Sequence, residues 1–291
     1  MSHTLNEWTV LSMLEWATSY FEEKEVKSPR LSIEWLLAYI LDIKRLDLYL
    51  KYDRPLSVDE LNALRPFVKR RANHEPLQYI TGEADFYNCT LAVNQSVLIP
   101  RQETEQLVDL ICKNHKHAED LKVLDIGTGS GCIPIAIKKE FNFWDVSGFD
   151  VSDEALELAK ENAVFNDVSV KFFKHSLFNL LDDYKNAEFD LIISNPPYIL
   201  FEEEDTLDDE VKNFEPHLAL FCENTQKMYG AIEGFCSKHL AEDGILYLEV
   251  HENYSEEVVT LFNQRNWSAK SIKDLDGKSR FLTIQKDKNF S

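Results

Sequence analysis

Long apolar runs are missing from this sequence of 291 residues. No stretch approaches the roughly 18 apolar residues that a membrane-spanning helix needs. The opening residues, MSHTLNEWTVLSMLEW, mix Asn6, Glu7 and Glu15 with apolar residues, so they lack the basic end and the apolar core of a secretory signal. We therefore expect no membrane partner.

Cysteine is also sparse. The five cysteines are odd in number, widely spaced and never arranged as C-x-x-C. A reducing compartment is the simplest interpretation, and we expect the protein in the cytoplasm. The His115-x-His117 pair is too sparse for a metal site, and no bound metal is expected.

Basic residues are outnumbered by acidic ones. Lys and Arg number 31 against 51 Asp and Glu, which gives a formal net charge of -20 at pH 7. Such a charge repels a phosphate backbone unless basic residues gather locally. Nucleic acid is therefore disfavoured as a substrate or partner.

The first part of the chain, up to about residue 80, indicates helices. Apolar residues recur at three- and four-residue intervals, as in Trp8, Leu11 and Leu14, which is typical of amphipathic helices. Ser57 and Glu60 have the form of a capping box, so a helix is expected to begin there. The length of the chain predicts about two domains, and we expect a small all-α domain over residues 1–78.

Residues 79–99 have a different pattern. The run DFYNCTLAV, from Asp85 to Val93, indicates a strand, a turn at Asn88 and a returning strand. We expect a β-hairpin linker here.

Beyond residue 100, short apolar strands alternate with helical segments. A helix over residues 152–165 is expected to be capped by Ser152. This alternation predicts a mostly parallel sheet with helices on both faces, and thus an α/β domain over residues 100–291. Ligands of such sheets bind beyond the carboxyl ends of the strands. The expected strands cover residues 122–125, 145–150, 189–194 and 245–250.

A glycine loop follows the first of these strands. The sequence VLDIGTGSGC places Gly127, Gly129 and Gly131 at alternate positions. Glycines let the backbone turn with positive φ and let a ligand approach closely. A dinucleotide fingerprint would need its third glycine where Cys132 stands. The tighter spacing therefore favours a nucleoside ligand without a bridging pyrophosphate.

Two carboxylates accompany this loop. Asp125 lies where an amino-bearing or cationic ligand would sit. Asp150, at the end of the next strand, is placed to accept hydrogen bonds from both ribose hydroxyls. Together with the loop, they favour S-adenosyl-L-methionine as the ligand.

The sequence SNPPYI, residues 194–199, follows the third expected strand. Pro196 and Pro197 fix φ and remove two backbone donors, so nearby carbonyl groups point outward from a stiff turn. The Asn195 side-chain oxygen and the Pro196 carbonyl can then accept both hydrogens of a planar NH2 group, with Tyr198 packed on its face. Such contacts raise the electron density on an amide or exocyclic amine nitrogen and aim it at a sulfonium methyl. The motif predicts methyl transfer to nitrogen.

Motifs spread along the chain carry a family resemblance. They are IPRQETE (99–105), DIGTGSG (125–131), SNPPYI (194–199), NFEPHLAL (213–220) and DLDGKSRFLTI (274–284). The set resembles the protein-(glutamine-N5) methyltransferases that modify peptide chain release factors, the bacterial PrmC/HemK family. HEPLQYITGEADFY, residues 74–87, is similar to that family's link between helical and catalytic domains, so the resemblance covers nearly the whole chain.

The resemblance implies a Rossmann-like methyltransferase domain over residues 100–291 and a substrate-recognition role for residues 1–78. It implies methyl transfer from S-adenosyl-L-methionine, leaving S-adenosyl-L-homocysteine. The acceptor would be the side-chain amide nitrogen of the glutamine in the Gly-Gly-Gln loop of class I peptide chain release factors, and the methylation would tune translation termination.

Site residues follow from the matching motifs. The expected donor-binding residues are Asp125, Gly127, Thr128, Gly129, Ser130, Gly131, Asp150, Leu177 and Asn195. The expected substrate-binding residues are Arg101, Glu103, Asn195, Pro196, Pro197 and Tyr198, of which Asn195, Pro196 and Tyr198 would be catalytic. Two positions depart from the family pattern. Gln102 stands where the family often has proline. Ser176 stands where it usually has an acidic residue beside the adenine, which leaves Leu177 as the apolar contact there.

Two alternatives stay open. An adenine-N6 methyltransferase acting on DNA or RNA would use the same pocket, but the acidic charge and the lack of an evident long basic channel count against it. A non-catalytic module that retains the donor site is the second, and the intact Asn195 to Tyr198 motif counts against that. We expect the chain to act as a monomer.

Overall fold

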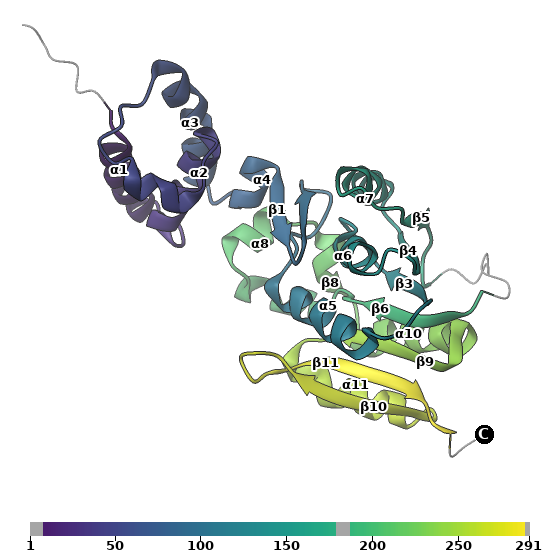
Figure 1. Cartoon of the computed structure of the whole chain (residues 1–291). Coiled ribbons are helices and arrows are strands. Elements are labelled where there is room, and N and C mark those ends of the chain that lie inside the picture. The colour runs from purple at the N-terminus through teal and green to yellow at the C-terminus, as the bar shows by residue number, and fades with distance from the viewer. Residues whose placement is uncertain (1–7, 179–186, 289–291) are drawn as a thin grey trace, which may run out of the picture. The chain divides into compact units, whose positions relative to one another are not determined.

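The computed structural model describes residues 8–178 and 187–288 (Figure 1). The chain divides into two compact units, residues 1–82 with 208–214, and residues 83–207 with 215–291. The chain therefore leaves the first unit, returns to it for one short segment, and leaves it again. Within the described ranges, no helix is both long and apolar enough to cross a membrane.

The first unit is helical. The expected capping box is present, because the Glu60 N–H donates to Ser57 Oγ at 3.2 Å and the Ser57 N–H to the Glu60 carboxylate at 2.8 Å. Pro66 lies inside the helix that follows without ending it. The helices are α1 (Val10–Glu23), α2 (Pro29–Ile40), η1 (Arg45–Leu50), α3 (Val58–Arg71), α4 (Leu77–Thr81) and α8 (Asp209–Phe214).

Arg71 ties α8 to the other helices of this unit. Its buried guanidinium donates to Glu210 Oε1 at 2.7 Å and to Ser32 Oγ at 3.0 Å. Lys27 forms a second ion pair with Asp208. A buried arginine that lost its carboxylate would be costly, so α8 is a fixed part of the helical unit.

The second unit is built on one seven-stranded sheet. In spatial order its strands are β10 (Trp267–Lys273), β11 (Ser279–Lys286), β9 (Leu240–Glu249), β6 (Phe189–Ser194), β3 (Lys122–Ile126), β4 (Asp145–Asp150) and β5 (Lys171–Lys174). Neighbours from β9 to β5 pair in parallel, whereas β11 pairs antiparallel with both β9 and β10. The expected mostly parallel sheet is confirmed, with an antiparallel pair at one edge.

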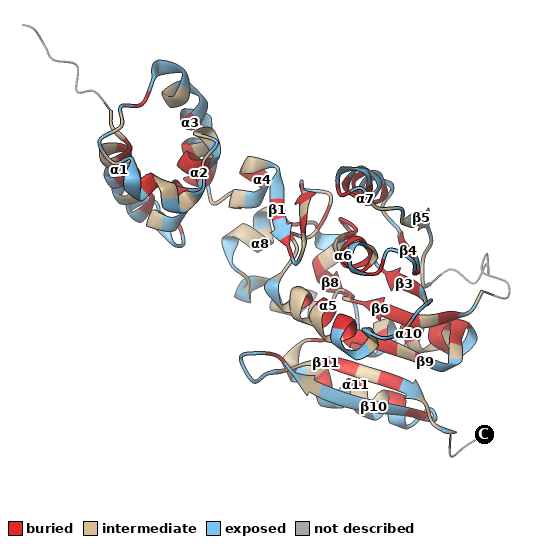
Figure 2. Cartoon of the chain, in the orientation of Figure 1, coloured by how far each residue is buried: buried red, intermediate tan, exposed pale blue. Residues whose placement is uncertain are grey.

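Helices cover both faces of this sheet (Figure 1). Successive residues of β3 point to opposite faces, Val123 into one apolar cluster and Leu124 into the other. Figure 2 shows the buried residues running along these central strands. One cluster includes residues of α5 (Gln102–His115), α6 (Cys132–Glu140) and α7 (Asp153–Phe165), and the other includes residues of α10 (Thr225–His239) and α11 (Ser255–Asn263).

Shorter elements complete the unit. The expected hairpin consists of β1 (Glu83–Phe86) and β2 (Cys89–Ala92), which pair antiparallel. Ser152 caps α7 as expected, since its Oγ accepts from the Ala155 N–H at 3.2 Å. The remaining short elements are β7 (Ile199–Leu200), η2 (Phe201–Thr206), α9 (His217–Leu220), β8 (Phe221–Cys222) and η3 (Glu252–Tyr254).

The carboxyl ends of three neighbouring strands form the rim on which the motifs lie. Ile126 of β3 is in register with Phe149 of β4 on one side and with Ser194 of β6 on the other. β4 and β5, which come next in the chain, lie on one side of β3, and the later strands β6 and β9 lie on the other. α/β sheets bind ligands at such a switch point.

Candidate active site

The glycine loop leaves β3 in a left-handed conformation. The φ angles of Gly127, Gly129 and Gly131 are 72°, 52° and 80°, values that other residues rarely adopt. A Cβ at Gly131 would also lie 3.0 to 3.2 Å from the side chains of Ile135, Phe172 and Ala159. At Gly127 and Gly129 nothing lies within 4 Å of that position, so the loop keeps open space where a ligand can approach.

Asp150 at the end of β4 is fixed by the same loop. Its Oδ2 accepts from the Gly129 N–H at 2.9 Å, and its Oδ1 accepts from the Ser152 N–H at 3.0 Å. A carboxylate offers about four acceptor positions, so both oxygens keep capacity for ligand hydroxyls. The strand end and the loop therefore present one prearranged acceptor group.

Asp125 and Thr128 are residues of the site whose buried side-chain oxygens lack a hydrogen-bond partner within the described residues. Asp125 is 1% exposed, and neither carboxylate oxygen has a hydrogen-bond partner among the residues that the structure describes. Burial raises the pKa of Asp125 to about 7, the nearby Thr128 hydroxyl opposes this shift, and the charge of Asp150 adds to it. Buried carboxylates without partners are rare because they cost free energy. A ligand ammonium group would supply the missing donors, which fits the amino-acid part of S-adenosyl-L-methionine.

Asn195 begins the turn after β6, and its side-chain amide is hydrogen-bonded to α5. Asn195 Nδ2 donates to Thr104 Oγ1 on α5 at 3.1 Å. Pro196 is buried, and the Tyr198 ring lies 5.7 Å from that of His251 between centroids. Burial raises the pKa of Tyr198 to about 12, so its phenol stays protonated near neutral pH.

Thr104 and Glu249 are site residues that we did not predict. The Thr104 hydroxyl donates to Glu249 Oε2 at 2.8 Å, and both side chains are 2% exposed. The sequence signals were the position of Thr104 within IPRQETE, residues 99–105, and a single carboxylate in the otherwise apolar strand ILYLEV, residues 245–250. Their pairing joins the start of α5 to the end of β9.

The predicted substrate residues Arg101 and Glu103 lie at the start of α5. Arg101 forms an ion pair with Glu215, whose buried carboxylate also accepts from the Ile99 N–H at 3.3 Å. Both residues are close enough to Tyr198 to influence its pKa. Leu177, the predicted adenine contact, is partly buried against the apolar cluster that includes α10.

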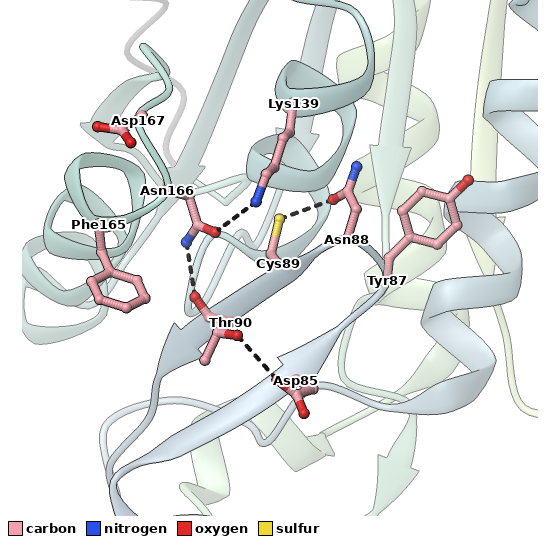
Figure 3. Close-up of a pocket in the computed structure, with 9 residues that line it drawn as sticks. All are labelled: Asp85, Tyr87, Asn88, Cys89, Thr90, Lys139, Phe165, Asn166 and Asp167. Atoms are coloured by element: carbon pink, nitrogen blue, oxygen red, sulfur yellow. Dashed lines mark hydrogen bonds between the residues drawn. The ribbon is translucent and has the colours of Figure 1, made fainter. Parts of the chain in front are cut away.

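A separate hollow lies away from these residues (Figure 3). It has a volume of about 710 Å³ and lies between the β1–β2 hairpin, α6 and the end of α7. Figure 3 shows Asn166 bridging two of its walls, with Lys139 Nζ donating to Asn166 Oδ1 at 3.4 Å and Asn166 Nδ2 to the Thr90 carbonyl at 2.9 Å. None of the predicted site residues lines it. Across residues 8–178 and 187–288, no group of three or more His, Cys, Asp and Glu side chains is arranged to hold a metal ion.

Two family models match the chain. Residues 12–82 match the PrmC N-terminal domain, and residues 101–213 match the methyltransferase small domain. The solved structure of the hMettl16 catalytic domain in complex with MAT2A 3'UTR hairpin 1 has a TM-score of 0.55 and 15% identity, covering 78% of this chain and 80% of that one. At that identity the likeness shows the shared methyltransferase fold alone.

Relatives of similar length match far more closely in sequence. The release factor glutamine methyltransferase of Leptospira interrogans is 37% identical over 281 residues, which cover 95% of this chain and 98% of that protein. The one from Geobacter sulfurreducens is 40% identical over 258 residues, covering 88% and 89%. The chain therefore belongs to the release factor glutamine methyltransferase family, whose members take the methyl group from S-adenosyl-L-methionine.

Proposed function

We propose that this chain methylates the side-chain amide nitrogen, N5, of the glutamine in the Gly-Gly-Gln motif of class I peptide chain release factors, and so tunes translation termination. The observation that carries the proposal is the orientation of Asn195. Because its Nδ2 is used by Thr104, its Oδ1 is left to accept from a substrate amide. The similarity to release factor glutamine methyltransferases supports the same substrate class.

The donor site proposed here uses the rim of β3 and β4. The loop from Gly127 through Thr128, Gly129 and Ser130 to Gly131 would approach the donor with its backbone. Asp125 would accept from the donor's ammonium group, and Asp150 from its ribose hydroxyls. Leu177 would pack beside the adenine.

The acceptor site proposed here uses the turn after β6. Asn195 Oδ1 and the Pro196 carbonyl would accept the two hydrogens of the glutamine amide, in a turn stiffened by Pro197. Tyr198 would pack its ring on the amide plane, and its raised pKa supports this role because a neutral phenol is no base. Arg101 and Glu103 would flank the incoming peptide.

Catalysis would come from positioning and electrostatics. Bound S-adenosyl-L-methionine supplies an electrophilic methyl on sulfur and leaves as S-adenosyl-L-homocysteine. Two acceptors on the amide hydrogens raise the electron density on a nitrogen whose lone pair is otherwise delocalised. They also aim that lone pair, so that attack needs little further ordering. The nitrogen returns to neutral by losing one of its hydrogens as a proton to water.

We also propose how the chain is divided. Residues 1–78 would recognise the release factor, residues 79–99 would link the parts, and residues 100–291 would carry out catalysis. A monomer in the cytoplasm is the state that we propose, and the five free cysteines support a reducing compartment.

The test is methyl transfer from labelled S-adenosyl-L-methionine to purified class I release factors, DNA and ribosomal RNA, offered side by side. Mass spectrometry would then locate the label. We expect label on the glutamine of the Gly-Gly-Gln motif. Label only on adenine would keep the pocket and overturn the substrate, and donor binding without any label would point to the non-catalytic alternative.

A further inference from the structure

Three polar side chains, of which Thr104 and Glu249 are buried and Asn195 is half-buried, form a chain of hydrogen bonds behind the acceptor site. Asn195 Nδ2 donates to Thr104 Oγ1 at 3.1 Å, and Thr104 Oγ1 donates to Glu249 Oε2 at 2.8 Å. Thr104 and Glu249 are both 2% exposed, so water does not compete for these contacts. In the chemistry proposed above, Thr104 enters only as the partner of the Asn195 amide, and Glu249 has no role.

The fold brings the three together through strand register. Ser194 of β6 pairs with Leu248 of β9, so Asn195 and Glu249 each follow one member of a paired position on adjacent parallel strands. Thr104 lies in the first turn of α5, which begins after Arg101. Thr104 and Glu249 therefore lie in a helix and a strand, which hold side chains more precisely than loops do, and Asn195 directly follows the end of β6.

Counting protons fixes the direction of each hydrogen bond. An ionised Glu249 can only accept, so the single hydrogen of the Thr104 hydroxyl must go to it. The Thr104 oxygen can then only accept, which requires Asn195 to turn its NH2 group toward it. The Asn195 oxygen is thereby directed away from the core. A reversed Asn195 would present two hydrogens to a substrate amide that also presents two.

We propose that Thr104 and Glu249 are positioning residues that hold the Asn195 amide with its oxygen toward the substrate nitrogen. This inference rests on the proposed function, because it concerns the orientation of the Asn195 amide in the same acceptor site. It predicts that the Thr104 hydroxyl matters for the rate of methyl transfer and has little effect on donor binding.

The protonation state of Glu249 should then make the rate of methyl transfer depend on pH. Burial raises the pKa of Glu249 to about 7, while Thr104, Arg280 and Arg101 lower it and Glu103 raises it. A neutral Glu249 can donate to Thr104, so the hydrogen bonds lose their fixed direction and the rate should fall as the pH drops through about 7. The titratable groups that interact with Glu249 from neighbouring elements are Arg101 and Glu103 on α5, Cys132 on α6, Tyr198 after β6, Tyr229 on α10 and Arg280 on β11.

The central experiment compares Thr104→Val, which removes the hydroxyl, with Thr104→Ser, which keeps it. Single-turnover methyl transfer to a release factor should slow roughly 10- to 100-fold in Thr104→Val. Thr104→Ser should recover to within about threefold of wild type, and calorimetry should show the same donor affinity in both. The matched control is Thr260→Val on the exposed side of α11, where the hydroxyl donates to the Glu256 carbonyl of the same helix. A wild-type rate in Thr104→Val, or equal loss in Thr104→Ser, overturns the proposal.

A second variant tests the charge. Glu249→Gln is neutral at every pH, so its rate should be roughly tenfold lower at pH 8 and should no longer fall below pH 7. If the rate of methyl transfer in Glu249→Gln fell below pH 7 as it does in wild type, the role of Glu249 would be refuted.

A third readout needs no acceptor and so separates this inference from the proposed function. The side-chain amide signal of Asn195 in nitrogen-15 NMR, assigned by its loss in Asn195→Ala, should shift in Thr104→Val and stay in place in Thr104→Ser. If wild type methylates no release factor, the proposed function fails while this signal still tests the hydrogen bond. If the signal does not move in Thr104→Val, the positioning role fails even in an active enzyme.

Discussion

Two buried carboxylates, one within β3 and one at the end of β9, differ in what surrounds them. Asp125 and Glu249 are almost fully buried, and burial raises the pKa of each to about 7. Within the described part of the chain, the oxygens of Asp125 have no hydrogen-bond partner. Glu249 accepts from Thr104 and is influenced by the nearby Arg280.

Ligand-binding groups and supporting groups can be told apart in this site by their hydrogen-bond partners. A buried carboxylate with a hydrogen-bond partner in the fold holds other side chains of the protein, whereas one left without a partner beside a glycine loop is a candidate for binding a ligand. Asp125 should therefore control donor binding, and Glu249 should control the acceptor side.

The largest effect on turnover is expected at Asn195, which is linked to Glu249 through Thr104. Asn195→Ala should cut turnover at least about a hundredfold, because a preorganised polar contact to the reacting group is lost. Donor affinity, measured by calorimetry, should stay within about threefold of wild type. Full turnover in this variant would show that the proposed acceptor pocket is wrong.

A smaller effect is expected at Asp125, in donor affinity. Asp125→Asn should weaken binding of S-adenosyl-L-methionine about 10- to 100-fold, since hydrogen bonds to a charged group are worth about 1.5 to 3 kcal/mol. An ammonium ligand should also lower the pKa of Asp125 and release about half a proton near pH 7.

The matched control is Glu249→Gln, which keeps Asp125. It should bind the donor as wild type does and release the same fraction of a proton, measured in buffers of different ionisation enthalpy. If Glu249→Gln lost this proton release and Asp125→Asn kept it, the roles of the two carboxylates would be reversed.

The remaining effect is expected in stability and leaves the division of roles between the two carboxylates to the functional tests. The pKa of Glu249 is raised from its ordinary 4.5 to about 7 in the folded chain, so its contribution to stability is fully present below about pH 4.5 and is lost as the pH rises through about 7. Glu249→Gln removes the cost of burying the charge. At pH 8 the free energy of unfolding should rise by about 3 kcal/mol, since the pKa is raised from 4.5 to about 7 and one pKa unit corresponds to about 1.4 kcal/mol.

Urea titrations at pH 5 and pH 8 measure this effect. The variant and wild type should differ little at pH 5, where Glu249 is already protonated, and the gap should widen toward pH 8. A variant that is equally destabilised at both pH values would show that Glu249 supports the fold through packing or its hydrogen bond and that its charge is not costly.

Local signals in the sequence predicted most of the fold. The strands over 145–150 and 189–194 have the predicted bounds, and the caps at Ser57 and Ser152 are formed as predicted. Each of these depends on residues a few positions apart, where periodicity and capping chemistry are decisive.

Long-range pairings were not predictable. Thr104 and Glu249 are 145 positions apart and meet only because β6 and β9 pair in a particular register beside α5. Arg101 was predicted only as a substrate residue, and its ion pair with Glu215 again joins distant segments. The roles of the predicted donor and acceptor residues stay predictions until the experiments above are done.

Two separate segments of the chain build the helical unit, and this limits how chimeric proteins can be made. Because residues 208–214 belong to that unit, a swap of the first 82 residues for those of a relative would leave Glu210 facing a foreign helix in place of Arg71. Chimeras should therefore transfer both segments together. The helical unit is thus built from two separate segments, and the second of them interrupts the α/β unit between residues 207 and 215.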